Sequence, residues 1–259
     1  MYTLFEILLN VGSLLIIYMT AWFVLAFILK RRDVADVAWG LGFVLAGWAA
    51  YQMRSNETWF TTAALILTSV WGLRLFVHIG RRNLRKKSED YRYANLGQLG
   101  SLRAWLRTYV GVFLLQAGLI LVVSLPVIAI MHSRSEPLEW LVYAGLGLWI
   151  VGIIFEATAD WQLSEFLASG TKGLMTSGLW SISRHPNYFG ELTTWWGAAV
   201  VAVGFGQWWG IIGAVVITLL ITKISGVPLL EKRYAYRPDF QKYAKKTPLL
   251  VPFIGKKHV

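Results

Sequence analysis

The sequence predicts an all-α fold, a polytopic bundle of about seven membrane-spanning helices. Hydrophobic residues make up 56% of the 259-residue chain and its mean hydropathy is +0.52, whereas soluble globular domains are rarely so apolar. Long runs with few charges are each about the 20 residues that a helix needs to cross the hydrocarbon core of a bilayer. The short alternating segments of an outer-membrane β-barrel are missing.

Seven apolar spans follow one another along the chain. They run near 6–29, 34–53, 59–80, 108–131, 139–161, 187–206 and 208–227. The last two are separated by only four residues, which suits a tight turn or a broken helix. Two stretches, 81–107 and 228–259, are too long to be simple connectors. We expect them to complete a functional site of a single integral membrane domain that covers 1–259.

The basic residues predict the orientation of the chain. Three follow the first span, eight lie between Arg81 and Arg107, two lie between the fifth and sixth spans, and nine lie from Lys223 onward. Only Arg54 and Arg134 lie on the opposite side. Because lysine and arginine are enriched in cytoplasmic loops, the N-terminus is expected outside and the C-terminus in the cytoplasm, and an odd number of spans agrees.

Cysteine usage and charge exclude several function classes. The chain has no cysteine, which rules out disulfides, zinc–thiolate sites, iron–sulfur clusters and cysteine nucleophiles. The formal net charge of +11 could suggest nucleic acid. In a membrane protein it more often reflects cytoplasmic loops that face anionic lipid. We therefore expect membrane lipid and no nucleic acid as a partner, and no oligomer is required.

The stretch 181–197, S-I-S-R-H-P-N-Y-F-G-E-L-T-T-W-W-G, organises the rest of the chain. Its proline suits the first turn of a helix and keeps the preceding residue extended. A loop with Arg184 and His185 should therefore lead into a helix, on which Asn187 and Glu191 share one face. A helix N-terminus beside a cation attracts phosphate, whereas a carboxylate one turn deeper needs another role.

Ionisable side chains inside the spans gather toward the predicted cytoplasmic ends. They are Asp33 and Asp36 on the second span, Arg74 and His78 on the third, Glu156 and Asp160 on the fifth, and Glu191 on the sixth. Such groups are costly in a membrane and by default mark a functional cavity. Ion pairs that hold the bundle together are the structural alternative, and Asp33 alone is expected to cap its helix. Four helices with polar groups at one depth predict a chamber open to the cytoplasm.

Several chemistries lack their sequence signature here. No H-x-x-x-H or H-E-x-x-H spacing exists, so no metal site is expected. The G-x-S-x-G elbow of serine hydrolases and the G-x-G-x-x-G of Rossmann modules are also missing. A phosphate-bearing cofactor remains compatible with the chain, because the cytoplasmic arginines and the helix start supply charge and the tail supplies aromatic rings that could stack on an adenine.

These motifs resemble those of a known superfamily. The bacterial membrane proteins related to steroid 5α-reductases are similar at S-R-H-P-N-Y-F-G-E-L (183–192), D-V-A-W-G (36–40), W-G-L-R-L (71–75) and E-D-Y-R-Y (89–93). The sterol Δ14- and Δ7-reductases resemble the first motif, with Asp in place of Glu191. A wider kinship includes the isoprenylcysteine carboxyl methyltransferases and phospholipid methyltransferases, which have R-H-P-x-Y-x-G and a C-terminal glutamate motif.

The resemblance implies that NADPH binds on the cytoplasmic side. In the reductases the cofactor lies against the 184–191 segment, the arginines after the third span and the tyrosine-rich tail. Carried over by motif, the implied cofactor residues are Arg81, Arg82, Arg85, Arg92, Asp160, Lys172, Arg184, His185, Asn187, Tyr188, Glu191, Glu231, Tyr236 and Tyr243.

The resemblance also implies catalytic residues. Asp36 lies where the steroid reductases have a glutamate that, with a tyrosine on the next span, polarises the steroid carbonyl. This chain has Ile79 beside His78 at the tyrosine position, so His78 or a tyrosine from elsewhere would have to serve. Glu191 would accept a hydrogen bond from the nicotinamide carboxamide or orient a proton donor.

The expected function is NADPH-dependent reduction of the conjugated double bond of a steroid-like 3-oxo-4-ene lipid. The hydride would go to the β-carbon, and an acid would stabilise the charge that develops on the enone oxygen. The enzyme would lie in a bacterial inner membrane, with its active site open to the cytoplasm.

Two alternatives remain open. An S-adenosylmethionine-dependent methyltransferase of a lipid or isoprenyl substrate would use Arg184, His185, Tyr188 and Glu231 for its cofactor. It would need no cations for phosphates, so the eight basic residues at 81–107 favour the reductase. A non-catalytic lipid-binding or transport protein is the other alternative, although the paired repeats usual in transporters are not found.

Overall fold

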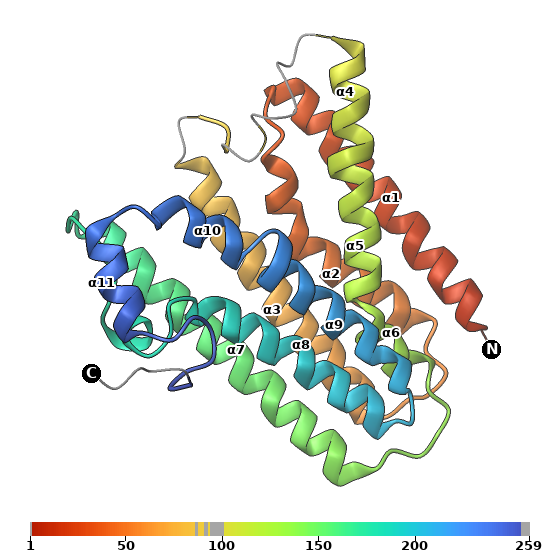
Figure 1. Ribbon diagram of the computed structural model, residues 1–259. Coiled ribbons are helices and arrows are strands. Elements are labelled where there is room, and N and C mark those ends of the chain that lie inside the picture. The colour runs from red at the N-terminus through yellow and green to blue at the C-terminus, as the bar shows by residue number, and fades with distance from the viewer. Residues whose placement is uncertain (1, 86–87, 91–92, 94–100, 255–259) are drawn as a thin grey trace. The chain divides into compact units, whose positions relative to one another are not determined.

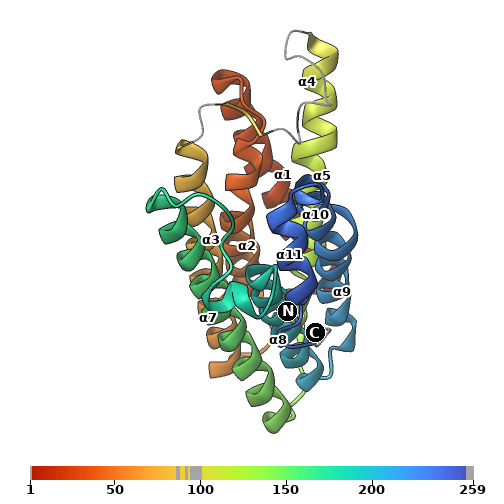
Figure 2. The same cartoon turned by 60° about the vertical axis from the view of Figure 1, so that its left-hand side comes forward.

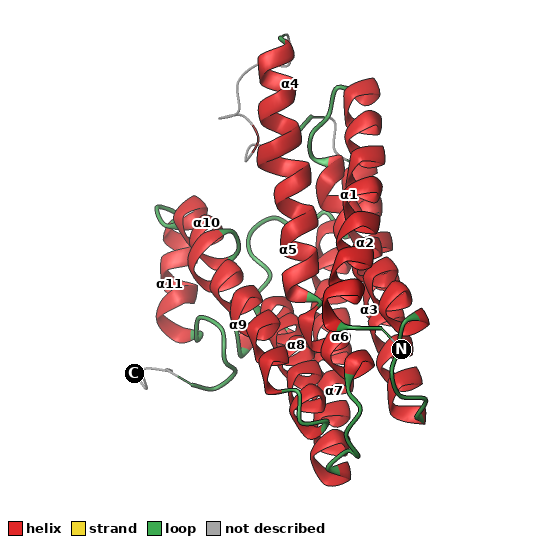
Figure 3. Cartoon of the chain, turned by 90° about the vertical axis from the view of Figure 1, so that its right-hand side faces the viewer, coloured by secondary structure: helices red, strands yellow, loops and turns green. Residues whose placement is uncertain are grey.

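The computed structural model describes residues 2–85, 88–90, 93 and 101–254. These residues form helices joined by loops and turns, and Figure 3 shows no strand among them. Six helical stretches are long and apolar enough to cross a membrane. The prediction of an all-α, polytopic membrane bundle is therefore confirmed, while the orientation of the chain stays a prediction.

The chain divides into two compact units, and each is described here by itself. The first comprises Met1–Leu138 and Ala202–Gly213, and the second comprises Glu139–Val201 and Ala214–Val259. Figure 1 labels the helices of both. The single membrane domain expected from the sequence stays a prediction.

The first unit contains six of the helices. They are α1 (Leu4–Leu29), α2 (Val34–Gln52), α3 (Trp59–Leu84), α4 (Leu102–Thr108), α5 (Leu115–Val123) and α6 (Leu125–His132). A π-helical turn joins α4 to α5 in one continuous helix, as Figure 3 shows. The predicted span 108–131 is interrupted after α5, because Pro126 cannot continue the ladder of helical hydrogen bonds.

The second unit holds most of the remaining helices. They are α7 (Glu139–Ala168), α8 (Pro186–Gly204), α9 (Ile211–Leu219), α10 (Val227–Tyr234) and α11 (Pro238–Lys246), with the last residues of α8 and the first of α9 counted in the first unit. Helix α8 begins at the predicted proline. It is not among the six apolar stretches, because its first turns carry Asn187 and Glu191. The count of seven spans therefore stays a prediction.

Helices α7 and α8 lie side by side at backbone contact (Figures 1 and 2). A Cβ atom on Gly190 would lie 2.4 Å from the backbone nitrogen of Glu156, and one on Gly152 would lie 2.3 Å from that of Thr194. No side chain fits at such distances, so only glycine permits this approach. The contact brings the polar face of α7 against the polar face of α8.

Candidate active site

The turn between α1 and α2 is fixed by Arg31. Its Nε and Nη2 atoms donate hydrogen bonds of 3.0 and 2.9 Å to the two carboxylate oxygens of Asp33. This bond is the main reason that the pKa of Arg31 is raised. Asp33 occupies the N-cap position of α2 but makes no side-chain capping bond. The predicted cap is wrong in that respect, because Arg31 takes both oxygens.

Arg32 joins the same turn to residues 88–90. Its backbone N–H, Nε and Nη2 donate to the carboxylate of Glu89 at 2.6, 3.0 and 2.6 Å. Arg32 is only 4% exposed. A guanidinium and a carboxylate paired in this way form the strong, geometrically specific class of hydrogen bond.

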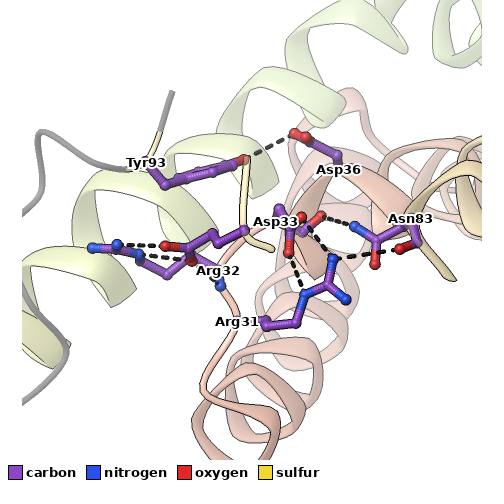
Figure 4. A network of polar contacts seen from close by, with 7 residues as sticks. Arg31, Arg32, Asp33, Asp36, Asn83 and Tyr93 are labelled. Carbon is purple, nitrogen blue, oxygen red and sulfur yellow. Dashed lines mark hydrogen bonds and ion pairs between the residues drawn. The ribbon is translucent and has the colours of Figure 1, made fainter. Parts of the chain in front are cut away.

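Tyr93 reaches the carboxylate of Asp36 from the stretch after α3. The phenol oxygen donates to Asp36 Oδ1 at 2.9 Å, and the tyrosine is buried (Figure 4). Sequence reasoning left open which tyrosine could replace the missing one at Ile79. Tyr93 belongs to the motif E-D-Y-R-Y, but the spacing of this motif from α2 gave no sign that Tyr93 folds back onto Asp36.

The other residues predicted on α3 lie near its end. His78 is half-buried, whereas Arg81, Arg82 and Arg85 are exposed. Arg92 lies outside the described residues. These three arginines are exposed to solvent, so a ligand can reach them.

In the second unit Glu231 of α10 connects two residues that precede α8. Its carboxylate pairs with Arg184 Nη1 at 2.8 Å and with His185 Nε2 at 2.9 Å. Tyr188 stacks on the imidazole of His185, with ring centroids 5.7 Å apart. Four residues predicted for the cofactor set are thus one cluster.

The chain around residue 250 holds this cluster in place. Ser183 Oγ donates to the carbonyl of Leu250 at 2.7 Å, and the N–H of Arg184 donates to the carbonyl of Pro248 at 2.9 Å. The hydroxyl of Tyr243, on α11, donates to the carbonyls of Trp180 and Ser183. The tail is therefore hydrogen-bonded to the loop before α8.

Asp160 and Asn187 meet across the contact between α7 and α8. The Nδ2 of Asn187 donates to Asp160 Oδ1 at 3.3 Å, and Asp160 is 6% exposed. Glu191 lies half-buried one turn further along α8. Two other predicted residues stand apart, because Lys172 is exposed in the loop after α7 and Tyr236 is 92% exposed.

A pocket of about 510 Å³ opens beside Arg184 and Glu231. Lys232 of α10 and Lys245 of α11 add two cations to its lining, and Phe240 adds an aromatic ring. The guanidinium of Arg184 lies 5.9 Å from the centroid of that ring, and its Nε is buried without a hydrogen-bond partner in the described part of the chain. The sequence reading missed both lysines, because nothing in a basic tail marks which cations face a pocket.

Comparison with known proteins supports the resemblance found in the motifs. The family model described as a protein of unknown function, DUF1295, matches residues 22–247. Among curated proteins the chain is 28% identical over 129 residues to 3-oxo-5-alpha-steroid 4-dehydrogenase 1 of Macaca fascicularis, covering 45% of this chain and 46% of that protein.

Two further relatives are also named as reductases. The chain is 30% identical over 116 residues to very-long-chain enoyl-CoA reductase of Dictyostelium discoideum, covering 44% of this chain and 36% of that protein. It is 35% identical over 80 residues to steroid 5-alpha-reductase DET2 of Gossypium hirsutum, covering 29% and 31%. The chain therefore spans less than half the length of these relatives. No solved structure matches it. Because the family model covers most of the sequence, the chain belongs to the DUF1295 family of steroid 5α-reductase-like membrane proteins.

Proposed function

We propose that the chain reduces the conjugated carbon–carbon double bond of a membrane-soluble, steroid-like enone with NADPH. The observation that carries the proposal is the 2.9 Å hydrogen bond from Tyr93 to Asp36. It supplies a tyrosine–carboxylate pair in a chain that lacks the tyrosine expected beside His78. Relatives named 3-oxo-5-alpha-steroid 4-dehydrogenase and very-long-chain enoyl-CoA reductase support the same reaction class.

The pair suits a carbonyl oxygen on which negative charge develops. When a hydride adds to the β-carbon of an enone, electrons move to the carbonyl oxygen, and the resulting enolate needs a hydrogen-bond donor. Tyr93 is 8% exposed, and a donor in a dry, preorganised site stabilises such charge far better than water does. The enolate then takes a proton from water at its α-carbon, which gives the saturated ketone.

Asp36 has a role distinct from that of Tyr93. A phenol carries one hydrogen, so it cannot donate to Asp36 and to a substrate at the same time. In the proposal the phenol turns its hydrogen from Asp36 to the substrate oxygen as a hydrogen bond, and Asp36 positions Tyr93 before the substrate binds. Tyr93 acts on the substrate oxygen and Asp36 acts through Tyr93, so we expect neither to affect the affinity for the cofactor.

The pocket of the second unit suits the phosphates of NADPH. Arg184, Lys232 and Lys245 offer cations, and Phe240 offers a face for a flat ring. When bound, NADPH would supply the hydride. In the proposal the Asp160–Asn187 pair and Glu191 hold its nicotinamide end, since a carboxylate repels phosphate but accepts a hydrogen bond from a carboxamide.

One observation favours a second candidate function. The residues that a methyltransferase would use, Arg184, His185, Tyr188 and Glu231, form one cluster. S-adenosylmethionine carries one carboxylate and no phosphate, so it offers fewer anionic groups than NADPH does to the two lysines in the same pocket. We therefore rank the methyltransferase second.

The test uses the purified protein, NADPH and a panel of 3-oxo-4-ene steroids and other enones. We expect NADPH oxidation with at least one of them. Y93F and D36N should each lower kcat by roughly 100-fold, the usual effect of losing one donor to an oxyanion, with an unchanged Kd for NADPH. Y51F is the matched control, because the hydroxyl of Tyr51 is hydrogen-bonded to Thr62 at the far end of α2. Transfer of label from S-adenosylmethionine, without NADPH oxidation, would contradict the proposal.

A further inference from the structure

We propose that the Arg32–Glu89 ion pair is a latch that positions Tyr93 on Asp36. The inference rests on the proposed function, because it assumes that Tyr93 serves the reaction. It adds two positioning residues, neither of which was given a role from the sequence, although Glu89 lies in the motif E-D-Y-R-Y.

The latch and the Asp36–Tyr93 pair join the same two segments. Arg32 precedes Asp36 by four residues, and Glu89 precedes Tyr93 by four, so both contacts link positions 57 apart in the sequence. Figure 4 shows Arg32 and the contact between Tyr93 and Asp36 near the start of α2. Two segments held at two points keep a fixed register, whereas one contact would leave them free to pivot.

Each segment has a backbone hydrogen bond close to its two contacts. On one side the N–H of Ala35 donates to the carbonyl of Arg32 at 3.0 Å, as α2 begins. On the other side the N–H of Tyr93 donates to the carbonyl of Asp90 at 3.0 Å. A shift of the carboxylate of Glu89 would therefore be passed on to the phenol of Tyr93.

The latch is the stronger of the two contacts. The bond from Tyr93 to Asp36 is a single hydrogen bond, which contributes little net stability alone. Glu89 accepts three hydrogen bonds from Arg32, two of them from a guanidinium that is almost fully buried. The strong contact thus holds the weak one, and the weak one remains able to open for a substrate oxygen.

The kinetic test compares E89Q and E89D with E57Q. E89Q removes the charge, and E89D keeps the charge but shortens the side chain, so it serves if E89Q does not fold. Glu57 is the matched control, since it pairs with Arg54 at 2.7 Å at the other end of α2. The latch predicts that kcat falls by roughly 10- to 100-fold, as when a reacting group moves by about 1 Å. The Kd for NADPH and the KM for the enone should not change, and E89D should retain more turnover than E89Q.

A second readout needs no activity. The chain has no cysteine, so S88C can carry a single nitroxide label on an exposed residue next to Glu89. The latch predicts that the label becomes more mobile in the E89Q and E89D backgrounds and stays unchanged with E57Q. Unchanged mobility would overturn the latch. Greater mobility with normal kcat, while Y93F is impaired, would overturn its positioning role. Full turnover of Y93F would instead overturn the proposed function.

Discussion

The hydroxyl of Tyr243 joins α11 to the loop before α8 by donating to the carbonyls of Trp180 and Ser183. Burial raises the pKa of Tyr243 above its ordinary value of 10.0. The folded protein therefore keeps the donating, neutral phenol to a higher pH than the unfolded chain does. The stability that this provides is complete below about pH 10 and is lost as the pH rises beyond it.

Y243F should remove this pH dependence. At neutral pH the variant should melt at a lower temperature than the wild type, because it lacks the hydrogen bonds of the phenol. As the pH rises from about 10, the wild type should lose melting temperature faster than Y243F, so the difference narrows. Y236F is the matched control, since Tyr236 is 92% exposed. Parallel melting curves for the wild type and Y243F across this range would rule out the explanation.

The lysines of the pocket make a prediction about cofactor selectivity. If Lys245 and Lys232 meet the 2′-phosphate, which NADH lacks, the protein should bind NADPH more tightly than NADH, and added salt should weaken binding because the contacts are partly exposed. K245A should lose part of that preference. Lys242, on the same helix and exposed, does not line the pocket, so K242A should keep it. Fluorescence titration of the wild type, K245A and K242A with NADPH and with NADH measures these affinities, and equal affinities for the two cofactors in the wild type would count against the assignment.

At the scale of helices, the backbone contact between α7 and α8 determines how the polar faces meet. Gly190 touches the backbone of Glu156, four residues before Asp160. Because the two helices are this close, Asn187 reaches Asp160 directly. Moving the two helices apart should therefore weaken the Asp160–Asn187 hydrogen bond and also lower the stability of the protein.

G190A should push α7 and α8 apart. The added methyl would lie 2.4 Å from a backbone nitrogen, and overpacking of this kind costs typically 1–3 kcal/mol. G147A is the control on α7, since nothing lies within 4 Å of the Cβ it adds. We expect a lower melting temperature and weaker NADPH binding for G190A, and neither change for G147A. A G190A protein as stable as the wild type would show that the helices separate without cost.

Local sequence signals predicted the elements well. Proline chemistry placed the start of α8 at Pro186, and the apolar runs located α1, α2 and α3 closely. The break after α5 was missed, although Pro126 marks it, because hydropathy alone does not register a lost hydrogen bond. A strong local preference can therefore be predicted from the sequence alone, whereas an interruption inside an apolar run is harder to predict.

The candidate site was only partly predictable, for a physical reason. Asp160 and Asn187 lie on helices whose periodicity places them on inward faces, and a hydrogen bond joins them. Tyr93 and Glu89 reach their partners across 57 positions of sequence from a stretch with no regular period. Which loop residue folds back onto which helix depends on tertiary contacts that no spacing rule contains. The same holds for Lys232 and Lys245 at the pocket.

At the scale of the whole molecule, the orientation rests on the asymmetry of the basic residues. Each lysine or arginine near an anionic leaflet contributes about 1 kcal/mol, and all but a few of the 25 fall on one predicted side. The topology also depends on the number of spans. That number depends on whether α8 crosses the membrane, because its first turns are polar and it lies outside the six apolar stretches.

Single cysteines at three exposed positions decide between six and seven spans. The chain has no cysteine of its own, so E57C, K172C and K242C can each be labelled alone with a membrane-impermeant maleimide on intact cells. With the N-terminus outside, position 57 is outside and position 172 is inside whether or not α8 crosses. Position 242 follows α8, so it is inside with seven spans and outside with six. We expect E57C to be labelled on intact cells, and K172C and K242C only after the cells are permeabilised. Labelling of K242C on intact cells would mean that α8 does not cross, and would place the Lys232–Lys245 pocket on the side of the membrane away from cytoplasmic NADPH.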